Sequence, residues 1–172
     1  PAFIEAAQEQ LELLMKELAQ YSGLTVIVGH PKKTSAGLQN YASVLQNGKV
    51  IAGYAKQELP NHEVFDEVRY FVPGKEACVF ECEGIRYGVI LCEDAWHPGP
   101  AKQAHAAGAQ VLLVLNASPY HLQKEALRIE VLRKFVTRST NAVFDRRVLL
   151  DTLLPANDVC SDVLLAGQEG CL

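Results

Sequence analysis

Short apolar runs alternate with segments of helical periodicity along this chain, and the alternation limits it to folds that layer helices on sheets. Phe3–Gln20 repeats apolar residues at helical spacing, with glutamates and a lysine between them. Thr25–Gly29 and Gln110–Ser118 are apolar runs typical of buried strands, and we expect the first to be buried on both faces. Pro98–Ala107 and Leu122–Thr140 are predicted helices. The pattern predicts a layered α/β domain.

Two turn sequences predict β-hairpins. Asn47 and Gly48 join two apolar runs, and both residue types tolerate the positive φ that a tight hairpin turn requires. A second hairpin is expected to turn near Glu83 and Gly84, with its second strand leading into a cysteine. We predict that the polar stretch His30–Gly37 is a loop.

A long segment with proline and scattered charge, Lys56–Gly74, is predicted to be an ordered loop. Loops of this length in compact domains usually carry function. Taken alone, Lys56 would be a solvated lysine and Glu67 a loop carboxylate paired with Arg69. Only the motifs that surround these two residues give a reason to assign them a function.

The composition of the 172 residues excludes several classes of protein. A formal net charge of -4 argues against a nucleic-acid or anionic-membrane surface. We find no apolar run long enough to span a bilayer and no targeting leader, so we expect a cytoplasmic protein. Because the only methionine is Met15, we expect that natural sequence precedes Pro1.

The five cysteines do not have the spacing of a disulfide framework, which suits a reducing compartment. They are Cys78, Cys82, Cys92, Cys160 and Cys171. Cys78 and Cys82 lie on one face of a predicted strand, so simple packing is expected for both. The five histidines are scattered, without a nearby acidic partner at ligand spacing, and the sequence indicates no metal site.

Cys92 follows a buried strand and stands directly before Glu93 and Asp94. Neighbouring carboxylates disfavour a thiolate, so a reactive cysteine here would need a nearby cation. Trp96 is expected to anchor the loop that follows. A cysteine at a strand end is more often a small buried side chain than a nucleophile.

Four segments end core strands or fill the long loop: YAKQELPN, VFDEVRYF, GVILCEDAW and LNASPY. In this order, and preceded by PAFIEAAQEQL, they resemble the nitrilase, or carbon-nitrogen hydrolase, superfamily. The greatest similarity is to the glutamine-amidohydrolase domain of glutamine-dependent NAD+ synthetases, and it covers residues 1–140. The resemblance implies an α/β fold, the nitrilase-type α-β-β-α sandwich, present here as an incomplete piece.

The resemblance also implies roles for particular residues. Cys92 matches the nucleophile that attacks the substrate amide, and Lys56 matches the lysine that stabilises the oxyanion. Glu67 is aligned with a second family glutamate that aids positioning. Glu93 resembles the residue that holds the amino group of glutamine.

In the segment after the LNAS strand, Ser118 and Lys124 resemble the part of the family that recognises the substrate's α-carboxylate. The family's general-base glutamate would precede Pro1. We therefore expect little or no glutaminase turnover from these 172 residues.

The implied reaction is glutamine hydrolysis that supplies ammonia to a separate synthetase domain. It needs no cofactor at the glutaminase site, and ATP and Mg²⁺ would belong only to the synthetase domain, which is absent from these residues. The resemblance implies glutamine, that synthetase domain and a homo-oligomer as partners. Two alternatives stay open: a stand-alone nitrilase-family amidase acting on another small ω-amide, and a non-catalytic fragment or pseudoenzyme.

Residues 141–172 depart from the family pattern, and we predict a divergent tail outside the domain. Its apolar cluster within Leu149–Leu154 is expected to have no clear strand partner. A change of reading frame near Thr140 is a hypothesis for this departure, and the encoding DNA would test it.

Overall fold

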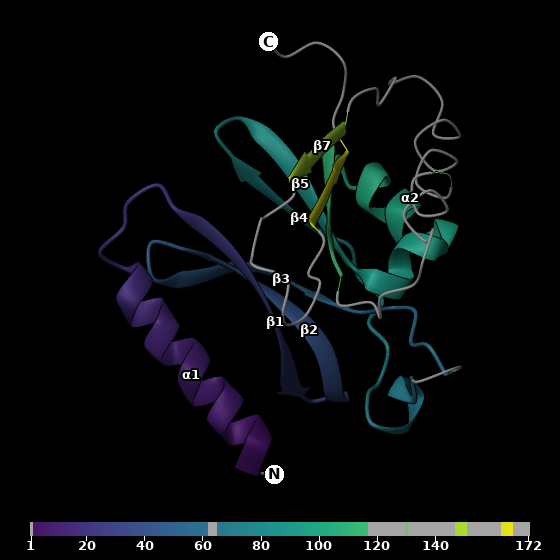
Figure 1. The fold of residues 1–172 in the computed structure, drawn as a ribbon, viewed down its shortest axis with the longest axis horizontal. Helices are drawn as coiled ribbons and strands as arrows, with labels where there is room; N and C mark the ends of the chain where they lie inside the picture. The colour runs from purple at the N-terminus through teal and green to yellow at the C-terminus, as the bar shows by residue number, and fades with distance from the viewer. Residues whose placement is uncertain (1, 62–64, 117–129, 131–146, 151–162, 167–172) are drawn as a thin grey trace. The chain divides into compact units, whose positions relative to one another are not determined.

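The computed structural model describes residues 2–61, 65–116, 130, 147–150 and 163–166 (Figure 1). The chain divides into two compact units, Pro1–Cys78 and Val79–Leu172. The first contains a helix and a three-stranded sheet, and the second contains most of a five-stranded sheet with a short helix. This mixture of helices and sheets confirms the predicted α/β class.

The first unit begins with α1 (Ala2–Leu18), in agreement with the predicted amphipathic helix. Leu11 is its buried residue, while Phe3 and Leu13 of the same helix are exposed. The helix ends before the turn that leads into the sheet. Its periodicity therefore identified the helix correctly, although only part of its apolar surface is covered within the unit.

Three antiparallel strands follow in the order β1 (Thr25–Thr34), β2 (Gly37–Gln46) and β3 (Lys49–Ala55). Central strand β2 carries the core of this unit, because its residues 42–45 are all buried. Four consecutive buried residues mean that both faces of the strand are covered there. Tyr54 of β3 is also buried.

The predicted Asn47 and Gly48 turn is confirmed. It joins β2 to β3, and the φ angles of the two residues are 49° and 71°. Both lie in the left-handed region that a two-residue hairpin turn needs. The strand after the turn leads directly into Lys56.

The prediction of a loop over residues 30–37 was wrong. Strand β1 continues to Thr34, whose partner in β2 is Gly37. Because β1 is an edge strand, it tolerates Pro31, which has no N–H to donate to the ladder. The expectation that Thr25–Gly29 is buried on both faces was also wrong, since no residue of β1 is fully buried.

The sheet of the second unit has the order β4-β5-β6-β8-β7. Its first strands are β4 (Cys78–Cys82) and β5 (Ile85–Leu91), joined by the predicted turn at Glu83 and Gly84, where φ is 51° and 78°. Helix α2 (Pro98–Ala106) then leads to β6 (Val111–Leu115), which is parallel to β5. These elements confirm the predicted hairpin, helix and strand.

Small side chains let α2 lie close to the sheet. A Cβ atom placed on Gly88 of β5 would lie 3.0 Å from the Cβ atoms of Ala104 and Ala109. Ala104 is buried, as are Val89 and Ile90 of the same strand. The alanine-rich composition of the helix thus reflects close packing on β5.

The prediction that the leucine cluster of the tail lacks a strand partner was wrong for Leu149 and Leu150, the members of the cluster that the structure describes. β7 (Arg147–Leu150) pairs antiparallel with β8 (Val163–Ala166), and β8 pairs with β6. The two strands extend the sheet past β6, because the unpaired backbone groups of an edge strand accept another apolar strand. The predicted helix over 122–140 lies outside the described residues.

None of the helices in the described part of the chain combines the length and the apolar character that crossing a bilayer requires.

Candidate active site

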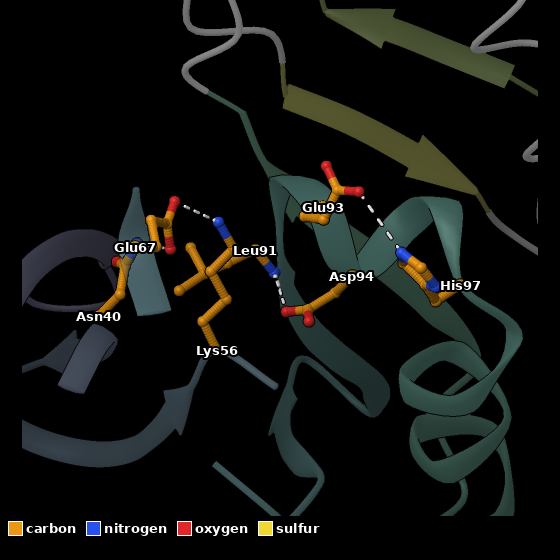
Figure 2. A network of polar contacts seen from close by, with 7 residues as sticks. All are labelled: Asn40, Lys56, Glu67, Leu91, Glu93, Asp94 and His97. Atoms are coloured by element: carbon orange, nitrogen blue, oxygen red, sulfur yellow. Dashed lines mark hydrogen bonds and ion pairs between the residues drawn. The ribbon is translucent and has the colours of Figure 1, made fainter. Parts of the chain in front are cut away.

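A buried ion pair lies at the end of β3 in the first unit. Lys56 Nζ donates a hydrogen bond to Glu67 Oε1 at 2.6 Å (Figure 2). The two side chains are only 3% and 15% exposed. A charged pair removed from water to this degree persists only when its geometry is well defined. The alternative of a solvated Lys56 was therefore wrong.

Backbone hydrogen bonds fix both partners of this pair. The Lys56 N–H donates to the Asn40 carbonyl at 2.9 Å, and the Lys56 carbonyl accepts from the Gly74 N–H at 2.8 Å. The Glu67 N–H donates to the Pro60 carbonyl at 3.1 Å. Gly74 can approach this closely because it has no Cβ, which would collide with the preceding strand at Ala55.

Glu67 begins the short 3-10 helix η1 (Glu67–Arg69) within the long loop. The alternative that Glu67 pairs with Arg69 was wrong. Arg69 Nη1 lies 3.6 Å from Asp66 Oδ2, and both of these side chains are largely exposed. The loop thus separates two neighbouring carboxylates: Asp66 faces solvent, and Glu67 contacts the buried lysine.

Asn40 belongs to this candidate site through its contact with Glu67, and the sequence analysis missed it. Its Nδ2 donates to Glu67 Oε2 at 3.2 Å, so each oxygen of this carboxylate has a partner (Figure 2). The available signal was an asparagine inside an apolar strand, where this residue type is depleted. Its partner Glu67 is 27 positions away in the chain, a separation that no local pattern reveals.

Cys92 belongs to the second unit and lies directly after β5. It is half-buried and begins the 3-10 helix η2 (Cys92–Trp96). Its φ of 43° places it in the left-handed region, which is uncommon for a residue with a side chain. Such backbone strain persists only where surrounding contacts determine it, and it concentrates at functional sites.

The two carboxylates after Cys92 have different surroundings. Asp94 is fully buried, and its Oδ2 accepts the Leu91 N–H at 3.0 Å. Glu93 is 20% exposed, and its Oε1 lies 3.4 Å from His97 Nε2 (Figure 2). His97 therefore has an acidic neighbour, which the sequence analysis did not expect. Asp94 serves the backbone of the turn, whereas Glu93 keeps part of its surface in solvent.

The remaining predicted site residues are not placed. Ser118 and Lys124 lie outside the described residues. Lys56 is in the first unit and Cys92 is in the second, so the implied pairing of this nucleophile with this lysine stays a prediction.

Cys78 is buried, and burial raises the pKa of its thiol, partly offset by a hydrogen bond with the Gly53 backbone. This matches the predicted packing role of Cys78. Cys82, for which the same role was predicted, is only half-buried. A thiol that is both buried and held protonated is a poor nucleophile, so the structure gives Cys78 no catalytic character.

Comparison with known proteins places these features in a family. Residues 1–143 match the carbon-nitrogen hydrolase family. The glutamine-dependent NAD(+) synthetase of Xanthomonas campestris is 39% identical over 140 residues, which are 78% of this chain and 25% of that protein. The chain thus spans about a quarter of the length of the curated relatives it matches.

Two solved structures extend the comparison. A glutamine-dependent NAD+ synthetase from Acinetobacter baumannii has a TM-score of 0.68 at 33% identity, over 76% of this chain and 25% of that one. A glutamate-to-glutamine mutant of the amidase from Nesterenkonia sp. AN1 has a TM-score of 0.56 at 26% identity, over 64% of this chain and 42% of that one. The amidase carries the acetamide moiety of fluoroacetamide on its active-site cysteine. These similarities confirm the predicted nitrilase-superfamily fold.

Proposed function

Because the chain belongs to the carbon-nitrogen hydrolase family, we propose that it forms the glutamine-hydrolysing part of a glutamine-dependent NAD+ synthetase. The observation that carries the proposal is the buried contact of Lys56 with Glu67, since Lys56 matches the family's oxyanion-stabilising lysine. The similarity to named synthetases supports the choice of glutamine over other amides.

In the proposed reaction, the sulfur of Cys92 attacks the side-chain amide carbon of glutamine. The carbonyl oxygen becomes an oxyanion, and the Lys56 ammonium stabilises this developing charge. The proton that the Cys92 thiol loses is transferred to the amide nitrogen, the carbon–nitrogen bond breaks and ammonia leaves, so that a γ-glutamyl thioester remains on Cys92. Water hydrolyses the thioester to glutamate and restores the thiol.

The surroundings of Lys56 support this role. A lysine ammonium carries three N–H donors. Glu67 Oε1 accepts a hydrogen bond from one of them, which fixes the orientation of the ammonium group. Donors that are already oriented need not reorganise when the oxyanion forms. Glu67 therefore acts in this proposal by positioning Lys56.

The substrate's polar groups would be held by three other residues. Glu93 would accept a hydrogen bond from the α-ammonium group of glutamine, since its carboxylate is partly exposed and directly follows Cys92 in the chain. Ser118 and Lys124 would bind the α-carboxylate. The ammonia would pass to a synthetase domain of the parent protein, where ATP and Mg²⁺ would act, and no cofactor is proposed for the glutaminase site. A homo-oligomer is part of the same proposal.

The test is alkylation of Cys92 by the chloroketone analogue of glutamine, followed by peptide mapping. Alkylation needs only the nucleophile and the binding groups, so it does not depend on complete turnover. We expect the glutamine analogue to modify Cys92 faster than the asparagine analogue does. Cys92→Ala should abolish this adduct, and Cys82→Ala, the matched control in the same unit, should retain it.

Two results would contradict the proposal. Equal rates for the two analogues and for chloroacetamide would favour an amidase acting on another small amide. No selective adduct on Cys92 with any of the three reagents would favour a non-catalytic protein.

A further inference from the structure

Asn40 contacts both members of the Lys56–Glu67 pair from one position on β2. Its carbonyl accepts the Lys56 N–H at 2.9 Å, and its side-chain Nδ2 donates to Glu67 Oε2 at 3.2 Å. We propose that Asn40 is a positioning residue. It holds the Glu67 carboxylate in the orientation in which Glu67 bonds to the Lys56 ammonium and keeps that group in place. The role of that ammonium in catalysis rests on the proposed function, but the positioning itself does not.

The chemistry of the groups fixes which atom of Asn40 faces Glu67. An ionised carboxylate has only acceptors, so the asparagine must present its amide nitrogen rather than its amide oxygen. Glu67 Oε1 is already bonded to Lys56 Nζ. Asn40 thus supplies the contact that stops the carboxylate from rotating about its last bond.

The location of Asn40 makes it a rigid anchor. It lies in the central strand β2, one residue after Gln39 and immediately before Tyr41, which pairs with Ala55 of β3. The buried residues 42–45 continue the same strand. A strand paired on both sides fixes the backbone from which the side chain extends, so only the rotations within the Asn40 side chain remain to be ordered by its hydrogen bond.

The backbone and side-chain contacts of Asn40 can be separated by mutation. Substitution leaves the carbonyl that accepts the Lys56 N–H, so the end of β3 stays in place. Asn40→Leu removes the donor but keeps a side chain with the same branching and the same number of heavy atoms, and Asn40→Ala removes the donor together with most of the side chain. Gln39→Ala is the matched control, because it truncates the neighbouring amide of the same strand.

The first readout is competitive acetylation of lysines by acetic anhydride in the full chain, with exposed Lys49 as the internal reference. A lysine held in a buried pair reacts slowly, and a loosened pair exposes its amine. We expect Asn40→Leu and Asn40→Ala to raise the labelling of Lys56 relative to Lys49 about tenfold. Gln39→Ala should leave the ratio unchanged.

The second readout protects the test against an Asn40 variant that fails to fold, because it leaves Asn40 in place. Hydrogen exchange of the Asn40 side-chain amide is followed by NMR in the wild-type chain and in Glu67→Gln. The substitution replaces a charged acceptor with a neutral one and weakens the hydrogen bond, so the exchange should become faster. The side-chain amide of Gln39 is the control, and its exchange rate should not change.

Unchanged Lys56 labelling in folded Asn40 variants, or unchanged Asn40 amide exchange in Glu67→Gln, would overturn the inference. Alkylation of Cys92 by the glutamine chloroketone separates this outcome from failure of the proposed function. A wild-type chain that is not alkylated refutes the glutaminase proposal alone. If the wild-type chain is alkylated, and the Asn40 variants are alkylated equally fast and show the wild-type labelling of Lys56, then the positioning role alone is refuted.

Discussion

The Leu91 N–H donates to Asp94 Oδ2 at 3.0 Å, and this hydrogen bond closes the turn that contains Cys92. Leu91 ends β5 in an extended conformation, whereas Cys92 has a φ of 43°. The chain therefore changes direction sharply at the cysteine, and a fully buried carboxylate satisfies the last N–H before the change. A carboxylate close to a thiol is unfavourable for thiolate formation, but its hydrogen bond here gives the acidic residue a structural role.

Removal of the Asp94 carboxylate is predicted to destabilise the second unit. Asp94→Ala leaves a buried N–H on Leu91 without its acceptor, which costs about 1–3 kcal/mol of unfolding free energy. Asp94→Asn keeps an acceptor oxygen and should cost less. Urea denaturation of both variants measures the difference, and Asp66→Ala, which removes an exposed carboxylate, is the control. Equal losses for Asp94→Ala and Asp94→Asn would mean that the hydrogen bond does not stabilise the turn.

Neutralising Glu67 is predicted to affect both stability and reactivity. Glu67→Gln leaves the Lys56 ammonium buried without its counter-charge, which costs about 3 kcal/mol. The alkylation of Cys92 by the glutamine chloroketone should slow about tenfold or more, because the ammonium of Lys56, the proposed oxyanion donor, is no longer held in its orientation. Asp66→Asn neutralises the adjacent exposed carboxylate and should change stability by less than about 1 kcal/mol. If the two variants behave alike in denaturation and alkylation, the buried pair has no special role.

Gly48 is predicted to be less replaceable than Gly84, although both have positive φ, at 71° and 78°. An alanine in this conformation costs about 1–2 kcal/mol by itself. At Gly48 the new Cβ would also lie 2.7 Å from the Ala19 Cβ and 3.0 Å from the Met15 carbonyl oxygen, whereas at Gly84 it would meet nothing within 4 Å. Thermal denaturation should therefore show a larger loss for Gly48→Ala than for Gly84→Ala. The reverse order would contradict this packing of α1 on the hairpin.

The parts of the fold that depend on local chemistry could be predicted from the sequence. The Asn47 and Gly48 turn was recognised because its positive φ angles are a property of two adjacent residues. The continuation of β1 through Pro31 to Thr34 was not recognised from the sequence, because it depends on pairing with β2. Polar composition alone favoured a loop there, and tertiary pairing overrode it.

The candidate site shows the same division. Lys56 and Cys92 were predicted as site residues because each lies in a family motif at the end of a strand. Asn40 was missed because its significance comes from a contact with Glu67, 27 residues away. Strand periodicity predicts which face a side chain occupies, but not which loop residue will fold over that face.

The stability of the first unit is predicted to fall in mild acid because of His30. Its Nδ1 lies 3.2 Å from the Pro31 carbonyl, which can only accept, so Nδ1 carries the proton in the neutral ring. Its Nε2 then accepts a hydrogen bond from the Ser43 hydroxyl at 2.8 Å. Burial lowers the pKa of His30 below its ordinary 6.5, with a further contribution from the charge of Lys32, and the Pro31 contact opposes the shift.

The lowered pKa fixes the sign of the effect. Between the folded-state pKa and 6.5 the unfolded chain binds a proton at His30 that the folded chain does not, so stability rises with pH in that window. The contribution of neutral His30 to the folding stability is complete above pH 6.5, and it is lost progressively as the pH falls below this value. Urea denaturation at a series of pH values should show a shallower pH dependence for His30→Gln than for the wild-type chain. Because other groups titrate in both chains, the informative quantity is the difference between the two curves, and parallel curves would show that His30 does not resist protonation in the folded state.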